Sequence, residues 1–159
     1  MKLYHGSYVD IKEIDFSMSF PNKDFGKGFY LSDNYEQAHQ IAQFKSEALN
    51  VQPVVNVYEF DEEILFQPEL LNIKIFKEYS EDWADFVLRN RTSNNGESIH
   101  DFDIVYGPIA NDRVGLQIRK LMEHDITFER FIENLKYMKG ITFQYFFGTK
   151  KSLNYLHKI

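Results

Sequence analysis

The 159-residue sequence contains no cysteine. It therefore offers no disulfide framework, no thiolate nucleophile and no cysteine-ligated zinc site. Basic residues are also few, because 18 lysines and arginines stand against 24 aspartates and glutamates, a net charge of −6. Proteins that mainly bind the nucleic-acid backbone usually have more basic than acidic residues. The net charge therefore argues against a protein that mainly binds nucleic acid, and it does not exclude a local basic groove.

Long apolar runs are missing as well. No stretch approaches the ~20 apolar residues of a membrane-spanning helix, and residues 1–10 lack the apolar run of a signal peptide. We therefore expect a cytoplasmic protein with no membrane partner. The five histidines show no spacing typical of metal ligands, so no metal site is expected.

Aromatic side chains are abundant, with 15 Phe and 10 Tyr, and hydrophobic residues make up 43% of the chain. The length fits one domain of ordinary size with a single well-buried core, which we place at residues 1–159. A core rich in flat side chains tends to leave slots with walls on which a ring can stack.

Hydrophobic periodicity alternates between strand and helix patterns, with no repeat and no linker. Strands are expected at 2–5, 29–31, 54–60, 71–76, 102–106 and 141–147. Helices are expected at 34–50, from the caps at Ser80, Asp112 and Thr127, and after Thr149, where Leu153 and Leu156 are included. The pattern predicts an α+β domain with largely antiparallel strands.

Two segments have more specific expectations. In the loop at 8–23, apolar residues are expected to pin the chain to the core, namely Ile11, Ile14 and Phe16. The helix at 34–50 carries an apolar stripe at helical spacing, made of Ala38, Ile41, Ala42, Ala48 and Leu49. Lys45 falls on this stripe and should lay its stem along it with the charge reaching out.

The stretch 24–38 has the features of a ligand-site wall. Glycines allow close backbone approach, and a short strand with an aromatic hydroxyl runs into a capped helix. It begins with Asp24-Phe25-Gly26, the magnesium-binding triplet of protein kinases. The glycine-rich and catalytic loops that accompany that triplet are absent, so we attribute the match to chance.

Three separated pieces together resemble the His-Tyr-Glu class of the ADP-ribosyltransferase superfamily, which includes poly(ADP-ribose) polymerases and diphtheria toxin. The pieces are Leu3-Tyr4-His5-Gly6-Ser7, Gly26-Lys27-Gly28-Phe29-Tyr30 and Phe143-Gln144-Tyr145-Phe146. Over its whole length, including 103–112, the chain resembles a bacterial family of uncharacterised domains placed in that superfamily. The resemblance implies an ADP-ribosyltransferase-like fold, with two packed, mainly antiparallel β-sheets, flanking helices and an NAD cleft between the sheets.

The resemblance also implies roles for individual residues. NAD is the substrate, no metal takes part, and the bond between nicotinamide and ribose breaks through an oxocarbenium-like transition state. His5 would hydrogen-bond a ribose hydroxyl, the Gly6 backbone would pair with the carboxamide, and Tyr30 would stack on the nicotinamide ring. Three further NAD-binding residues are expected around them: Ser7, Gly28 and Tyr35.

The third triad position departs from the family pattern, because Gln144 stands where the class has glutamate. An amide can hydrogen-bond ribose hydroxyls, but it brings no negative charge and cannot act as a general base. Polymer elongation is therefore not expected. Three options stay open: acceptor-assisted mono-ADP-ribosyl transfer, transfer to a reactive small molecule or nucleic-acid base, and NAD binding with little chemistry.

We therefore predict an NAD-dependent mono-ADP-ribosyltransferase with catalytic residues His5, Tyr30 and Gln144. Its acceptor is an unknown protein, nucleic acid or small molecule. Such a protein would be toxin-like or regulatory, bacterial, and held in check by an antitoxin-like protein partner. The alternative is a catalytically weak or inactive module that binds a nucleotide or a protein through the same cleft.

A third possibility, a toxin acting on nucleic acid, requires one contiguous basic patch made of Arg119, Lys120, Lys136, Lys150 and Lys151. Ordinary structural roles also stay open for individual residues. His5 could be a polar strand end, Tyr30 plain core packing and Gln144 a buried hydrogen-bonding residue. Lys27 is expected to be a solvated loop lysine rather than a pyrophosphate contact. Asn111 and Asp112 are expected to cap a helix rather than touch a ligand.

Overall fold

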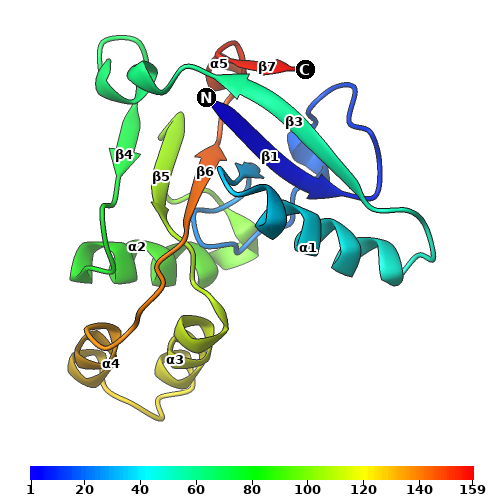
Figure 1. Ribbon diagram of the computed structural model, residues 1–159. Coiled ribbons are helices and arrows are strands. Elements are labelled where there is room, and N and C mark those ends of the chain that lie inside the picture. The colour runs from blue at the N-terminus through cyan, green and yellow to red at the C-terminus, as the bar shows by residue number, and fades with distance from the viewer.

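The computed structural model describes residues 1–159 and contains seven strands in two sheets (Figure 1). The three-stranded sheet has the order β1 (Lys2–Ser7), β3 (Val54–Phe60), β7 (Leu156–Lys158). The four-stranded sheet has the order β2 (Phe29–Leu31), β6 (Phe143–Phe147), β5 (Ile104–Pro108), β4 (Ile73–Ile75). All pairs are antiparallel except β4 with β5. The predicted α+β class with mainly antiparallel sheets is confirmed.

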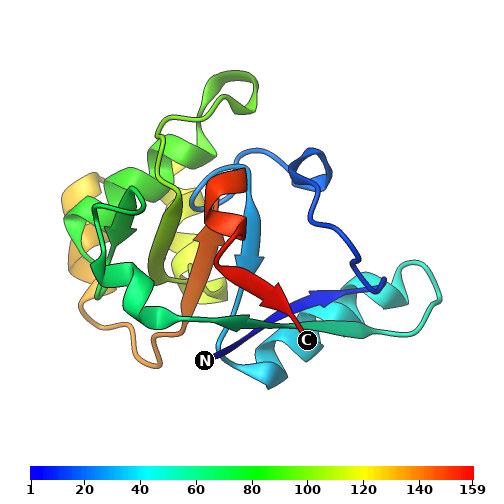
Figure 2. The same cartoon turned by 90° about the horizontal axis from the view of Figure 1, so that it is seen from above.

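The two sheets meet at a single backbone bridge. The Tyr4 N–H donates to the Ser32 carbonyl over 2.7 Å, and the Ser32 N–H donates back to the Tyr4 carbonyl over 2.9 Å. Beyond this bridge β1 continues along β3 while β2 pairs with β6. Seen from above, β1 and β3 run across the strands of the other sheet (Figure 2). The edges of β1 and β2 therefore separate and leave a wedge between the sheets.

The helices begin where the predicted caps place them. They are α1 (Tyr35–Glu47), α2 (Glu81–Arg91), α3 (Asp112–Met122), α4 (Phe128–Leu135) and α5 (Lys150–Leu153). Each has a side-chain oxygen accepting from a backbone N–H of its first turn, and these caps are Asn34, Ser80, Asn111, Thr127 and Thr149. Of the two residues expected to cap α3, Asn111 is confirmed as the cap, whereas Asp112 is the first residue of the helix.

The core has two parts on opposite faces of the four-stranded sheet. One lies between the sheets, and its members include Leu3, Phe29, Tyr58, Phe60, Ile104, Tyr145 and Phe147. The predicted loop anchors Ile11, Ile14 and Phe16 pack against it. The other lies under α2, α3 and α4 and includes Phe25, Trp83, Val87, Val105, Ile118, Phe131 and Phe146. Phe25 fixes the loop before β2, which supplies one wall of the cavity described below.

Several local predictions were wrong. The expected strand at 71–76 is only three residues long and runs parallel to β5. In α1 only the small side chains Ala38, Ala42 and Ser46 are buried, whereas Ile41 and Leu49 are 44% and 53% exposed. Close packing of α1 on β1 leaves no room for larger side chains.

At the C-terminus, the expected helix ends at Leu153, and Leu156 belongs to β7 instead. Leu156 pairs with Phe60 of β3, so the segment after α5 forms the third strand of that sheet instead of extending the helix. The segment at 62–66, for which no element was predicted, is a 3₁₀ helix. No helix in the chain is both long enough and apolar enough to cross a membrane.

Candidate functional site

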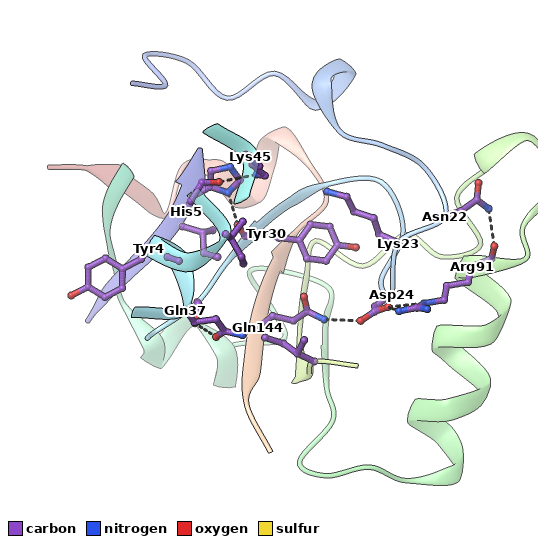
Figure 3. Close-up of a pocket in the computed structure, with 16 residues that line it drawn as sticks. Tyr4, His5, Asn22, Lys23, Asp24, Tyr30, Gln37, Lys45, Arg91 and Gln144 are labelled. Carbon is purple, nitrogen blue, oxygen red and sulfur yellow. Dashed lines mark hydrogen bonds and ion pairs between the residues drawn. The ribbon is translucent and has the colours of Figure 1, made fainter. Parts of the chain in front are cut away.

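A cavity of about 420 Å³ lies in the wedge between the two sheets (Figure 3). Its walls come from β1, β2, α1, the loop before β2, the end of α2 and β6. Four of the predicted site residues line it: His5, Gly6, Tyr30 and Gln144. They are separated by up to 139 positions in the chain, as His5 and Gln144 are, and the fold brings them to one place.

Three other predicted residues do not line this cavity. Ser7 is buried, and its hydroxyl accepts from the Val9 N–H over 3.3 Å. Gly28 packs against the core, where an added Cβ would lie 2.2 Å from the Phe146 ring. Tyr35 is 47% exposed on the first turn of α1. The structure gives these three residues packing or surface positions and does not bring them together with the other four.

His5 lines the cavity as a neutral imidazole. Its Nδ1 lies 2.7 Å from the Tyr30 carbonyl oxygen, which can only accept, so Nδ1 carries the proton and Nε2 has a free lone pair. The ring stacks on Phe29 with 4.4 Å between centroids. Burial is the main cause that lowers the pKa of His5 to about 4, and the charges of Lys45 and Lys23 add to it.

Tyr30 both packs against the core under α2, α3 and α4 and lines the cavity. Its hydroxyl donates to the Gly26 carbonyl over 2.6 Å and accepts from the Phe25 N–H over 3.1 Å, so it fixes the turn before β2. Burial raises the pKa of this phenol well above its usual range. The ring still lines the cavity, and Lys23 Nζ lies 4.8 Å from its centroid. Only the ring face, and not the hydroxyl, is available to a ligand.

Gly6 is required by packing as much as by any ligand. A Cβ at this position would lie 2.0 Å from the Ala38 carbonyl oxygen and 2.8 Å from the Ala42 nitrogen, both backbone atoms of α1. The Gly6 carbonyl accepts a hydrogen bond from Lys45 Nζ over 2.7 Å. The lysine on the predicted stripe therefore directs its charge along β1 into the cavity rather than out to solvent.

The sequence did not reveal the polar group beside Gln144. Arg91 donates to Asp24 Oδ1 from Nε over 2.8 Å and from Nη2 over 2.5 Å. Gln144 Nε2 donates to Asp24 Oδ2 over 3.3 Å, which leaves Gln144 Oε1 for another donor. Figure 3 shows this chain of contacts crossing the floor of the cavity from β6 to α2.

Asp24 thus places one carboxylate beside Gln144, and Arg91 forms an ion pair with it. The sequence predicts no role for Asp24 beyond its place in the kinase-like triplet. Arg91 was expected in a surface loop, whereas it lies at the end of α2. Asp24 and Arg91 are 67 positions apart, so the periodicity of a single helix or strand cannot indicate that they are in contact. An acidic residue placed directly before a buried aromatic in a glycine-rich loop was the one available signal.

The cavity is cationic although the whole chain is acidic. Three cationic side chains, Lys23, Lys45 and Arg91, line it with one carboxylate, Asp24. Burial lowers the pKa of Lys23, and the charge of Asp24 opposes this shift. Burial also lowers the pKa of Lys45, and the charge of Lys23 adds to that shift. Such a site suits a ligand that carries negative charge.

Other expected features lie elsewhere. Lys27 is exposed and does not line the cavity. Of the five basic residues considered for nucleic acid, Lys150 and Lys151 lie on α5, at the opposite end of the molecule from α3 and α4 (Figure 1). They do not form one patch with Arg119 and Lys120. No group of three or more His, Asp or Glu side chains is placed to hold a metal ion.

Comparison with known proteins gives a family but no function. A family model described as "Protein of unknown function (DUF3990)" matches residues 1–158. No curated protein matches the chain. No solved structure matches it either.

Proposed function

The chain belongs to the DUF3990 family, whose description assigns no function, and from its cavity we propose a mono-ADP-ribosyltransferase with NAD as substrate. One observation carries the proposal. His5, Tyr30 and Gln144 come from β1, β2 and β6 and line one cavity at the point where two sheets part. The resemblance to the His-Tyr-Glu class names these three positions, and an arrangement of two sheets with a cleft between them is what that class requires.

In this proposal the cavity residues divide the work of holding NAD. His5 Nε2 accepts a hydrogen bond from a ribose hydroxyl, because Nδ1 is committed to Tyr30. The Gly6 backbone pairs with the carboxamide, and the Tyr30 ring face supports the nicotinamide. Gln144 Oε1 orients ribose hydroxyls, since its amide nitrogen is held by Asp24. Fixing these groups before reaction lowers the entropic part of the barrier.

The reaction itself is a substitution at the anomeric carbon of the nicotinamide ribose. The electron pair of the carbon–nitrogen bond leaves with nicotinamide, which departs as a neutral molecule. The acceptor nucleophile then bonds to the same carbon and gives up its proton to its own base or to water. No side chain in the cavity offers a free carboxylate for that proton, because Asp24 is bound to Arg91. We therefore expect single transfers that depend on the nucleophilicity of the acceptor.

A second candidate function has one observation in its favour. The cavity lacks an unpaired negative charge to stabilise an oxocarbenium ion, because its single carboxylate is ion-paired. A module that binds a nucleotide and does little chemistry would need no such charge. This candidate uses the same cavity and differs from the first only in turnover.

Incubation of the purified protein with labelled NAD and a bacterial lysate tests the proposal. We expect release of nicotinamide and label on an acceptor, with both lost in Tyr30→Ala. Tyr35→Ala is the matched control, because Tyr35 is exposed, close in sequence and outside the cavity. Thermal melting of both variants shows whether they are folded. A protein that neither consumes NAD nor is stabilised by it would refute the proposal, and stabilisation without turnover would favour the binding module.

A further inference from the structure

We infer that Lys23 and Lys45 form a subsite for the pyrophosphate group of a dinucleotide, at the point where β1 and β2 separate. The anion subsite rests on geometry alone, and its assignment to the pyrophosphate of NAD rests on the proposed function. Lys23 comes from the loop before β2 and Lys45 from the last turn of α1. Both line the same cavity.

The first argument comes from the broken strand pairing. If the antiparallel pairing of β1 and β2 continued, the next hydrogen-bonded pair after Tyr4 and Ser32 would be Gly6 and Tyr30. Neither residue makes that pair, because Lys45 Nζ holds the Gly6 carbonyl and His5 Nδ1 holds the Tyr30 carbonyl. Both carbonyl acceptors at the split are thus taken by side chains. The N–H groups of Gly6 and Tyr30 lie on the same strand edges as those carbonyls, so the split is rich in donors.

The second argument concerns charge. Neither Lys23 nor Lys45 lies within 4.0 Å of a carboxylate, since the ion pairs of the chain all involve other cations. Both lysine residues are only partly exposed. Partly buried cations that lack a counterion are stabilised by an anionic ligand, and a phosphate offers several acceptor oxygens to both at once.

The third argument is that the two lysines contact the groups that nicotinamide would use. Lys45 Nζ holds the Gly6 carbonyl, and Lys23 Nζ lies over the Tyr30 ring at 4.8 Å. The nicotinamide ring of NAD is itself cationic, so these contacts oppose its entry on their own. A pyrophosphate bound nearby would draw both ammonium groups toward itself. The phosphates of the substrate are therefore needed for the nicotinamide to bind.

Titration calorimetry with three probes tests this inference: ADP-ribose, inorganic pyrophosphate and 1-methylnicotinamide, which has the cationic ring of NAD and no phosphate. We expect ADP-ribose and pyrophosphate to bind in a salt-dependent manner, and 1-methylnicotinamide to bind at least about tenfold more weakly than ADP-ribose. Lys23→Met and Lys45→Met should each weaken ADP-ribose binding about tenfold or more, as expected for a lost charge-assisted hydrogen bond. Lys27→Met is the matched control and should bind like the wild type, because Lys27 is exposed and outside the cavity.

Methionine keeps most of the lysine stem, and thermal melting shows whether each variant is folded. Lys45→Met should melt at a lower temperature than the wild type, because the Gly6 carbonyl loses the hydrogen bond from Lys45 Nζ. Wild-type affinity for ADP-ribose in both variants would overturn the inference even if NAD is cleaved. Binding of 1-methylnicotinamide as tight as that of ADP-ribose would also overturn it. Lysine-dependent binding of ADP-ribose in a protein that does not cleave NAD would support the subsite and refute only the proposed transferase activity.

Discussion

The buried His5 should make the stability of the protein depend on pH in a specific window. The pKa of His5 falls from 6.5 to about 4 on folding, chiefly through burial. The folded state therefore binds fewer protons than the unfolded state between these two values. Stability is fully present above pH 6.5 and is lost as the pH falls toward 4. At ~1.4 kcal/mol per pKa unit, His5 alone accounts for about 3 kcal/mol.

The variant His5→Asn isolates this contribution. Asparagine does not titrate, and its side-chain amide can still donate to the Tyr30 carbonyl that accepts from Nδ1 in the wild type. Urea denaturation of both proteins should be measured at several values from about pH 7 to about pH 4. Other groups, including His100, whose pKa burial also lowers, titrate in both proteins and cancel in the difference.

We expect the stability of the wild type relative to His5→Asn to drop by about 3 kcal/mol across that range. Parallel profiles within about 0.5 kcal/mol would refute the reasoning, because they would mean that His5 takes up a proton in the folded protein as easily as in the unfolded chain. The result also bears on the proposed function, in which a neutral His5 leaves Nε2 as an acceptor for a ribose hydroxyl.

Three further predictions concern the cavity walls. A double-mutant cycle of Asp24→Asn and Arg91→Met, measured by urea denaturation, should give a coupling free energy of about 2–3 kcal/mol, because the ion pair is largely shielded from water. A coupling near zero would contradict the geometry. Gly6→Ala should destabilise the protein by about 3 kcal/mol or prevent folding, because the added Cβ meets the Ala38 carbonyl at 2.0 Å, and wild-type melting would show that α1 can shift. Gln144→Glu places a second carboxylate beside Asp24, so its melting temperature relative to the wild type should fall as the pH rises, and Asp24→Asn in the same chain should remove that trend.

The sequence predicted those parts of the fold that local chemistry determines. Asn34, Ser80 and Thr127 cap helices because their side chains satisfy N–H groups within the next three residues, a requirement visible in a short window. The short apolar strand at 29–31 was equally clear. Partners across the chain were not predictable in this way. Leu156 fits a helical pattern, yet β3 offers it a strand partner about 100 positions away.

The candidate site also has residues that the local sequence indicates and contacts between distant parts of the chain that it does not indicate. His5 and Tyr30 were expected through their neighbours in sequence, and the cavity contains both. Gln144 was expected at the site, but the carboxylate beside it was not, since Asp24 and Arg91 come together only when α2 packs beside the loop before β2. Gly28, expected to bring the backbone close to NAD, and Tyr35, expected as a second wall, do not line the cavity, because a period of two or of 3.6 residues gives a face and not a depth.

The single bridge between Tyr4 and Ser32 has a consequence for dynamics. Two backbone hydrogen bonds are few for joining two sheets, so the amides of Tyr4 and Ser32 should exchange with solvent faster than those inside either sheet. A ligand that contacts β1 and β2 together ties the sheets at a second place, and it should slow this exchange without changing that of α3 or α4. Amide exchange at these two residues would then report whether a molecule spans the wedge, whatever chemistry follows.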